Sequence, residues 1–399
     1  MRVPRATAAA VAACLALAVT GCGADKIETA AAAEEGGPCV VEIGTLGPLS
    51  GPAADFGLSM KGTADLAAYE VNQAGGLRVG DRTCTVTVHP YDTGYTSAGA
   101  ANAAGDFVSQ GIRFVIGPLG ATEVTGMKPL AGRNDMLLVA NGFGRDALEP
   151  KYPLVFHVAP GPSVWAGPII AEARKRFDFQ KVTVVATNDQ SGSDIADVNA
   201  IRFREAGLPV TQESYQRGTQ DFAPLVSRIL STSPDLVDVA SSPAGDAGTM
   251  IKQLRQAGYQ GAFCRLGGES TAEIARVAGG YEVLGNFFFY SMVDLDDPAM
   301  KELSARYEQF AGREATSLTL GWMPGARALL RAISAAGTTT DTKAVAEELR
   351  ADPLDDASLG HGVWTGKEEF GVQQEMSFPF YAGFVQDGQM QPLVRLEVS

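Results

Sequence analysis

The sequence is 399 residues long, with 45% apolar and 20% charged residues, which is ordinary for a soluble globular protein. A chain of this length exceeds what one hydrophobic core usually organises, so we expect two domains. The formal net charge of −14 argues against a nucleic-acid partner and against peripheral binding to anionic lipid, because no basic face is available to neutralise phosphates.

The first residues have the order of a secretory signal. Arg2 and Arg5 form a short basic region, and the apolar run 6–19 that follows is too short to span a bilayer as a permanent helix. The segment 19–22, Val-Thr-Gly-Cys, resembles the lipobox of bacterial lipoproteins. This resemblance implies cleavage before Cys22 and a diacylglyceryl group on its sulfur. The alternative is an ordinary signal peptide that is cut elsewhere.

We therefore expect an exported protein that a lipid anchors to the outer face of the cell membrane. Residues 1–21 would be the signal peptide, and residues 22–38, which are small, polar and acidic, a flexible tether. No later segment has the unbroken apolar length of a transmembrane helix. The most apolar one, Val283 to Met292, is far too short.

Three cysteines remain after the signal and the lipobox. Cys39 and Cys84 each open an expected strand, and export to an oxidising space favours a disulfide between them. Cys264 then has no partner, and we expect it to be a small buried hydrophobic residue and not a nucleophile.

From residue 39 onwards, short β-branched runs alternate with segments whose apolar residues have helical spacing. The first such unit contains four expected strands, Val40–Leu46, Thr85–Tyr91, Phe114–Ile116 and Leu137–Ala140. Between them we expect three helices, Ala53–Gln73, Ser97–Ser109 and Thr122–Ala131. This alternation predicts a parallel sheet with helices on both faces.

A second unit of the same class begins after residue 161. Its expected strands are Val182–Thr187, Val210–Tyr215, Leu236–Ala240 and Ala262–Leu266. Its expected helices are Trp165–Phe177, Asp194–Glu205, Phe222–Leu230, Asp246–Gln256 and Thr271–Val277. The chain therefore repeats one architecture and is not a short-period repeat protein.

The rest of the chain is less regular. We expect a strand, then three helices, in Asn286–Met292, Met300–Phe310, Leu318–Ala335 and Thr342–Leu349. The end is rich in strands, at Gly362–Trp364, Phe378–Val385 and Pro392–Val398, with Asp387-Gly388 as a hairpin turn.

Two parallel sheets joined by more than one crossover predict a hinge. Ligands of open parallel sheets bind beyond the carboxyl ends of the strands, where helix N-termini point their amides. If two such edges face each other, the cleft between them is the binding site. The alternative is two rigidly packed domains without a hinge.

Several segments, in order, resemble the leucine/isoleucine/valine-binding type of periplasmic solute-binding proteins. The first is segment 43–57, Ile-Gly-Thr-Leu-Gly-Pro-Leu-Ser-Gly-Pro-Ala-Ala-Asp-Phe-Gly. Segments 71–77, 111–117 and 254–258 resemble further parts of the same family, so the likeness runs from about residue 39 to the C-terminus.

This resemblance implies a type I periplasmic binding protein fold. Two doubly wound α/β lobes would be joined by a three-crossover hinge, with lobe 1 made of residues 39–160 plus 291–378 and lobe 2 of residues 161–290 plus 379–399. The family captures a small solute, without a cofactor, for an ATP-driven ABC importer whose permease and ATPase subunits are separate chains. Amino acids, amides and small carboxylic or aromatic acids are its ligand classes.

The resemblance also implies which residues contact the solute. In the first lobe these are Ser50, Phe56, Gly120, Ala121, Thr122, Asn141, Gly142 and Phe143, and in the second lobe Ser191, Ser242 and Glu269. The Thr122 hydroxyl and the first amides of its helix could hold a ligand carboxylate without any cation; alternatively, Thr122 only caps that helix.

The second lobe departs from the family pattern. Tyrosines are usual where Ser191 stands and near Ser242, and the family's acidic residue aligns best with Gly267. Glu269 lies two positions further along, and Asp189 is a second candidate carboxylate. A buried ammonium needs a carboxylate partner, and none stands at the family's position. A ligand without an ammonium group is therefore a remaining alternative.

We expect no enzymatic activity and no metal site. The histidines His89, His157 and His361 are scattered, and neither a Gly-x-Ser-x-Gly elbow nor a phosphate-binding loop is present. Two alternatives to import remain. The closed form could signal to a membrane partner as a ligand sensor, or the chain could be a surface protein with a vestigial cleft.

Overall fold

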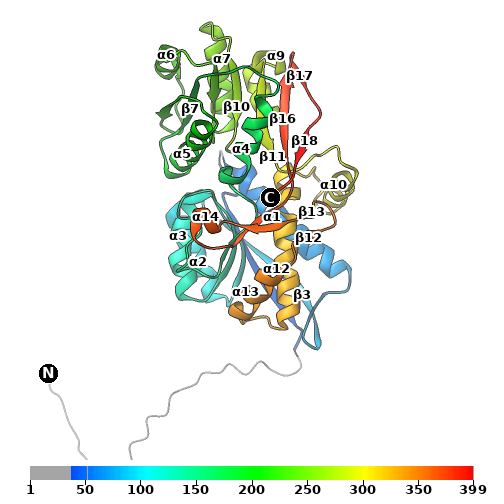
Figure 1. Cartoon of the computed structure of the whole chain (residues 1–399). Helices are drawn as coiled ribbons and strands as arrows, with labels where there is room; N and C mark the ends of the chain where they lie inside the picture. The colour runs from blue at the N-terminus through cyan, green and yellow to red at the C-terminus, as the bar shows by residue number, and fades with distance from the viewer. Residues whose placement is uncertain (1–36, 52, 399) are drawn as a thin grey trace, which may run out of the picture. The chain divides into compact units, whose positions relative to one another are not determined.

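The computed structural model of the chain describes residues 37–51 and 53–398 (Figure 1). The expected signal peptide and the lipid-anchor site Cys22 therefore lie outside the described residues. From Cys39 onwards the described chain forms one compact unit that contains two large sheets. None of the helices in this described part is long and apolar enough to cross a bilayer.

The first sheet is built mainly from the N-terminal third of the chain. Its strands are β1 (Val40–Gly47), β2 (Leu77–Val79), β3 (Arg82–Asp92), β4 (Phe114–Leu119), β5 (Leu137–Asn141), β6 (Val155–His157), β14 (Val363–Thr365) and β15 (Glu375–Ser377). They lie in the spatial order β14-β15-β6-β5-β4-β1-β3-β2. The central strands are parallel, and only the edge strands β2 and β14 run antiparallel to their neighbours.

Helices cover both faces of this sheet, and the alternation of side chains along its strands explains why. The helices are α1 (Ala54–Gln73), α2 (Ser97–Ser109), α3 (Gly120–Arg133), α10 (Pro298–Ala311), α11 (Ser317–Gly321), α12 (Met323–Ala336), α13 (Thr342–Ala351) and α14 (Lys367–Phe370). Val115 and Leu138 face the core under α2 and α3, whereas Ile116 and Val139 belong to the core with α1 and α12. A short hairpin of β12 (Asp355–Asp356) and β13 (Gly360–His361) lies apart from the sheet.

The second sheet is built from the middle of the chain and from its end. Its strands are β7 (Val182–Thr187), β8 (Val210–Tyr215), β9 (Leu236–Asp238), β10 (Ala262–Arg265), β11 (Phe287–Ser291), β16 (Phe380–Gln386), β17 (Gln389–Met390) and β18 (Val394–Leu396). Strands β8, β7, β9, β10 and β11 are parallel neighbours, and β16 adds antiparallel to β11. Its helices are α4 (Pro162–Ala173), α5 (Gln190–Glu205), α6 (Ala223–Ser231), α7 (Ala244–Gln256), α8 (Thr271–Ala278) and α9 (Tyr281–Leu284).

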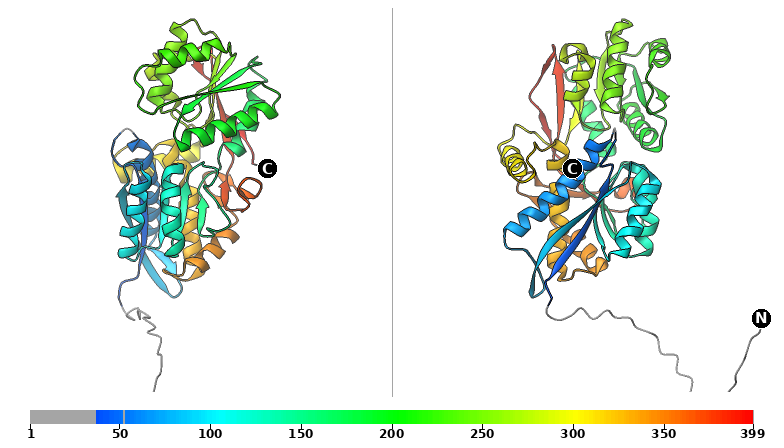
Figure 2. Two further views of the ribbon diagram at one scale, coloured as in Figure 1. Left: turned by 90° about the vertical axis from the view of Figure 1, so that its left-hand side faces the viewer. Right: turned by 180° about the vertical axis from the view of Figure 1, so that it is seen from behind.

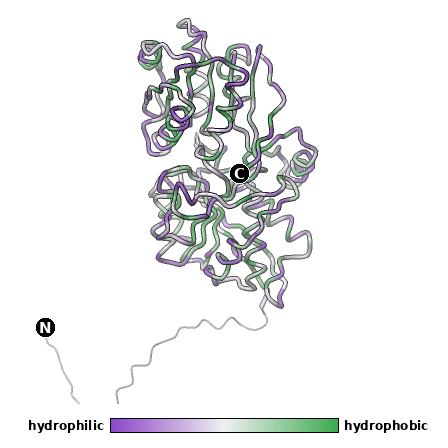
Figure 3. Tube along the Cα trace, viewed as in Figure 1, coloured by the Kyte–Doolittle hydropathy of each residue, from purple (hydrophilic) through white to green (hydrophobic). Residues whose placement is uncertain are grey.

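The chain passes between the two sheets three times: between β6 and β7, between β11 and α10, and between β15 and β16. We call each sheet with the helices packed on it a lobe; the second lobe carries α5, α6 and α7, in green in Figures 1 and 2. Hydrophobic residues follow the strands in the interior of both lobes (Figure 3). The expected fold class, two α/β lobes with mainly parallel sheets, is confirmed.

Several elements differ from the sequence expectations. The helix expected over Leu318–Ala335 is broken at Trp322 into α11 and α12, because Pro324 has no N–H to continue the helical hydrogen bonds. Strands β2, β6 and β15 were not expected; each has only three residues, too few to show a period. The hairpin turn Asp387-Gly388 is confirmed, since Gln386 pairs with Gln389 and both turn residues have positive φ.

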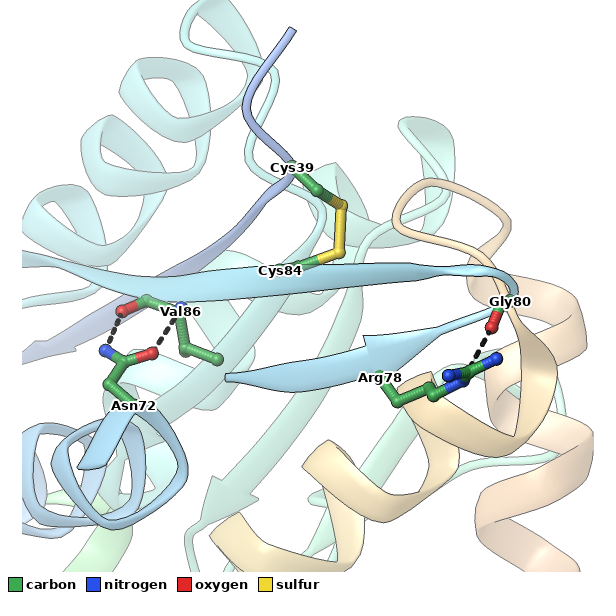
Figure 4. Close-up of a disulfide and its surroundings, with 6 residues drawn as sticks. All are labelled: Cys39, Asn72, Arg78, Gly80, Cys84 and Val86. Atoms are coloured by element: carbon green, nitrogen blue, oxygen red, sulfur yellow. Dashed lines mark hydrogen bonds between the residues drawn. A yellow bond between two sulfur atoms is a disulfide. The ribbon is translucent and has the colours of Figure 1, made fainter. Parts of the chain in front are cut away.

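A disulfide joins Cys39 to Cys84 at the start of β1 and within the adjacent strand β3 (Figure 4). Next to it, the side-chain amide of Asn72 at the end of α1 bonds both backbone groups of Val86, at 2.8 and 2.9 Å. The covalent bond and the amide bridge together fix the first strand pair and the first helix to one another. Cys264 in β10 is buried and free, as expected.

We predict that the disulfide stabilises the folded chain by about 2–4 kcal/mol, because it closes a long loop in the unfolded state. Replacing both Cys39 and Cys84 by alanine should lower the melting temperature. Dithiothreitol should lower the melting temperature of the wild type but not that of the double variant. Equal melting of the wild type with and without the reductant would contradict this expectation.

Candidate functional site

A cleft lies between the carboxyl ends of the two sheets, and both lobes contribute to its lining. Leu119 and Asn141 end β4 and β5 on one side, while Arg265 and Tyr290 stand at the ends of β10 and β11 on the other. The water-accessible space inside the cleft measures about 130 Å³. This is enough for several water molecules or one small organic molecule. Ligands of parallel sheets bind beyond the carboxyl ends of the strands, and here both sheets present such an edge to the cleft.

The structure brings together most of the residues that the sequence suggested. Those lining the cleft are Phe56, Gly120, Ala121, Asn141, Gly142, Phe143, Ser191 and Glu269. Three others, Ser50, Thr122 and Ser242, are not part of the lining. Contact of any of these residues with a solute stays a prediction.

The N-terminus of α3 forms one edge of the cleft. Because β4 runs into α3 without a spacer, the first backbone amides of the helix, at Gly120 and Ala121, lie beside the cavity. Gly120 has φ +77°, and a side chain there would collide with the hydroxyl of Tyr95, so only glycine fits.

Thr122 does not cap this helix, as one interpretation of the sequence proposed. Helix α3 begins two residues earlier, with Leu119 at the N-cap, so Thr122 lies within the first turn. A buried carboxylate replaces the expected cap: Glu123 accepts a hydrogen bond from the Leu119 N–H at 3.0 Å and another from the Thr93 hydroxyl. Burial raises the pKa of Glu123 to about 7, and these two hydrogen bonds act against the rise.

Ser50 and Ser242 lie outside the cleft lining. The Ser50 side chain is exposed and donates to Asp92 at 2.7 Å, and the Leu49 N–H donates to the same carboxylate, which turns this loop outward. Ser242 is fully buried and outside the lining, whereas its chain neighbour Ser241 does line the cleft.

Six aromatic side chains of the described residues contribute to the lining of the cleft. Trp165 of α4 stacks on Tyr290 with ring centroids 3.8 Å apart, and Phe143 meets the edge of Trp165 at 5.1 Å. The indole N–H of Trp165 donates to the Leu266 carbonyl at 2.9 Å, which fixes the ring. An apolar or aromatic solute would therefore find rigid surfaces of large area.

Glu269 lies in the lining but is already bound on both of its oxygens. One accepts the Met292 N–H and the other the Ser317 hydroxyl at the start of α11, so the carboxylate ties the second lobe to the first. Burial raises its pKa. Asp189, the other candidate acid, caps α5 and pairs with Arg217 at 2.7 Å, and it does not line the cleft.

The lining also contains buried polar atoms that have no hydrogen-bond partner among the described residues. They are Asn141 Oδ1, Ser191 Oγ, Ser241 Oγ, Trp322 Nε1 and the Nε and Nη1 atoms of Arg265. Buried polar groups are almost always paired, so such a cluster within one cleft indicates a site built to form hydrogen bonds with a group from outside the chain.

Sequence reasoning missed Arg265, Trp165, Trp322, Tyr95 and Tyr290. One signal was available: Arg265 is the only charged residue in the expected strand Ala262–Leu266, where an uncompensated charge is unfavourable. The aromatic residues carried no such signal, because aromatic residues are equally common in ordinary cores.

Within the described chain, no cluster of His, Cys, Asp and Glu side chains is arranged to hold a metal ion. Two mainly parallel lobes, three crossovers and a small-molecule cleft between facing strand ends together define a two-lobed solute-binding protein. A family model for periplasmic binding proteins matches residues 40–385. The chain belongs to this family, which is a family of binding proteins and not of enzymes.

Individual relatives agree with this assignment. A Leu/Ile/Val-binding protein homologue from Brucella melitensis is 27% identical over 323 residues, which cover 80% of this chain and 86% of the relative. A branched-chain amino acid transporter substrate-binding protein from Streptococcus pneumoniae, solved with isoleucine, has a TM-score of 0.75 and 18% identity, covering 90% of this chain and 99% of its own. A solute-binding protein from R. palustris, solved with benzoate, has a TM-score of 0.72 and 17% identity, covering 90% and 96%. The resemblance inferred from the sequence motifs is confirmed.

Glu123 allows a test of how the cleft edge depends on pH. Because its pKa is about 7 in the folded protein and ordinarily 4.5, the folded state retains a proton that the unfolded chain loses. Its contribution to stability therefore falls as the pH rises from about 4.5 through about 7, by an amount on the order of 3 kcal/mol.

In Glu123→Gln this fall in stability should be absent. The melting temperature of the variant minus that of the wild type should therefore increase between about pH 5 and pH 8. Thermal unfolding of both proteins across this range measures the difference. A difference that is constant with pH would show that Glu123 has no raised pKa.

Proposed function

We propose that this protein is the extracytoplasmic solute-binding subunit of an ABC importer, held at the outer face of the membrane by a lipid on Cys22. It captures one small organic molecule, an amino acid, an amide or a small carboxylic or aromatic acid, and delivers it to separate permease and ATPase subunits. Membership of the periplasmic binding protein family supports the solute-binding role. The isoleucine and benzoate bound by two structural neighbours support a small solute of this size.

The observation that carries the proposal is the cluster of unpaired buried polar atoms in a cleft that both lobes line. A molecule bound there contacts both lobes at once, so its binding energy is available to hold them together. We propose that residues 39–160 with 291–378 and residues 161–290 with 379–399 move as two bodies. Ligand binding then shifts the chain towards the closed form, which the membrane subunits recognise.

The test is a thermal-shift screen of the exported protein against amino acids, amides and small carboxylic and aromatic acids, followed by calorimetry on each stabilising compound. At least one solute should bind with a micromolar or lower Kd, equivalent to about 8 kcal/mol. Small-angle scattering should show a smaller radius of gyration with that solute than without it. If no compound stabilises the protein, or if the scattering curve is the same with and without a bound solute, the proposal is wrong.

Polar contacts between the lobes suggest what else stabilises the closed form. Arg145, in the loop after β5 of the first lobe, forms ion pairs with Asp194 and Asp197 on α5 of the second. Gln190 at the start of α5 donates to Asp146 at 3.2 Å. These contacts exist only when α5 lies against that loop, so they favour closure.

We predict that Arg145→Gln weakens solute binding by up to about fivefold, because exposed ion pairs contribute at most about 1 kcal/mol. Calorimetry with a solute from the screen measures the change. The matched control is Arg228→Gln, whose ion pair with Glu213 lies within the second lobe, and which should bind like the wild type. Equal affinity of Arg145→Gln and the control would exclude these ion pairs from closure.

A further inference from the structure

Arg265 is a fully buried arginine whose side chain reaches the cleft. It is the last residue of β10, it is 2% exposed, and it belongs to the cleft lining. Gly268 packs directly against it: a Cβ at that position would lie 3.1 Å from Nη2. The glycine therefore lets the loop after β10 close over the guanidinium without displacing it.

The guanidinium has no partner of its own. Its Nε and Nη1 atoms lack any hydrogen bond to the residues that the structure describes, and no carboxylate among those residues forms an ion pair with it. Burial lowers the pKa of Arg265 to about 10, so the group is still charged at neutral pH. An unpaired buried charge is strongly unfavourable, and natural proteins almost always compensate it.

The two nearest acids do not supply this compensation. Glu269 uses its oxygens to bind Met292 and Ser317. Asp238, below the cleft, accepts from Asn199 at 2.7 Å and from the Ala240 N–H at 2.8 Å, and burial raises its pKa to about 6. Both carboxylates influence Arg265 only through the longer-range interaction of their charges, and burial raises the pKa of both.

The cleft lining therefore contains one guanidinium without a partner, although the whole protein carries a net charge of −14. Among the described residues, the lining holds two guanidiniums, Arg217, which Asp189 neutralises in an ion pair, and Arg265, together with the single carboxylate Glu269. From the opposite lobe, the N-terminus of the 14-residue helix α3 adds a further partial positive charge at Ala121. Apart from Glu269, none of the residues lining the cleft could neutralise a ligand ammonium.

We propose that Arg265 pairs with a carboxylate of the captured solute and so makes the cleft selective for small apolar organic acids over neutral solutes. The inference rests on the proposed function, because it assigns a ligand class to the same cleft. The carboxylate accepts hydrogen bonds from the N–H groups of the guanidinium, and the apolar body of the solute lies against the Trp165–Tyr290 stack. Arg265 fits this role because a guanidinium presents several donors in a fixed plane that matches a carboxylate.

The test compares acids with neutral amides of the same shape, by calorimetry on the exported protein. Benzoate is paired with benzamide, and 4-methylpentanoate with 4-methylpentanamide. At least one acid should bind the wild type roughly thirtyfold or more tightly than its amide. The amide lacks the charge that pairs with Arg265, and removing one partner of a buried charge pair weakens binding strongly. In Arg265→Gln that preference should disappear, while Arg265→Lys, which keeps the charge, should retain part of it. Arg276→Gln on α8, whose exposed ion pair with Glu273 is remote from the cleft, is the control and should bind like the wild type.

The wild-type comparison does not depend on whether a variant folds, and circular dichroism checks each variant. If the wild type binds amides as tightly as the matched acids, or binds only neutral solutes, the inference about Arg265 is wrong while the solute-binding function stands. The inference is equally wrong if folded Arg265→Gln keeps the preference for acids. If neither the acids nor the amides bind but another solute of the wider screen does, the proposed ligand class is wrong and the solute-binding function stands.

Discussion

The direction of the strands is the constraint on which this molecule depends. In each sheet the central strands run parallel, so their carboxyl ends and the N-termini of the following helices gather at one edge. Backbone amides at such an edge have no partner within their own helix. Because the two edges face each other, groups such as the α3 amides, Asn141 and Arg265 converge on one small cavity, with contributions from elements far apart in the sequence.

Electrostatics gives this cavity a character opposite to that of the protein surface. The surface is acidic, as the net charge of −14 requires, yet the cleft lining contains the unpaired guanidinium of Arg265. A charge inside such a cleft interacts strongly, because the aromatic rings around it exclude water and lower the local dielectric. The same exclusion makes Arg265 energetically unfavourable when it is unpaired.

The contacts between the lobes have two different roles. The Arg145 ion pairs are exposed and therefore weak. The contact between Glu269 and Ser317 is buried beside the crossovers and fixes the loop that contains Gly268.

The sequence by itself determined the class of fold and most of its elements, because period and turn chemistry are local. Val182–Thr187, Val210–Tyr215 and Ser97–Ser109 were predicted to the residue. Eight predicted site residues line the cleft, since loops after parallel strands must meet at one edge. Only the tertiary structure decided the rest. It showed that Glu269 accepts a hydrogen bond from Ser317. It also showed that Glu123 and not Thr122 binds the backbone at the start of α3, and that Arg265 is buried without a partner. Burial and pairing depend on residues from separate elements, such as Glu269 and Ser317, and no local pattern records them.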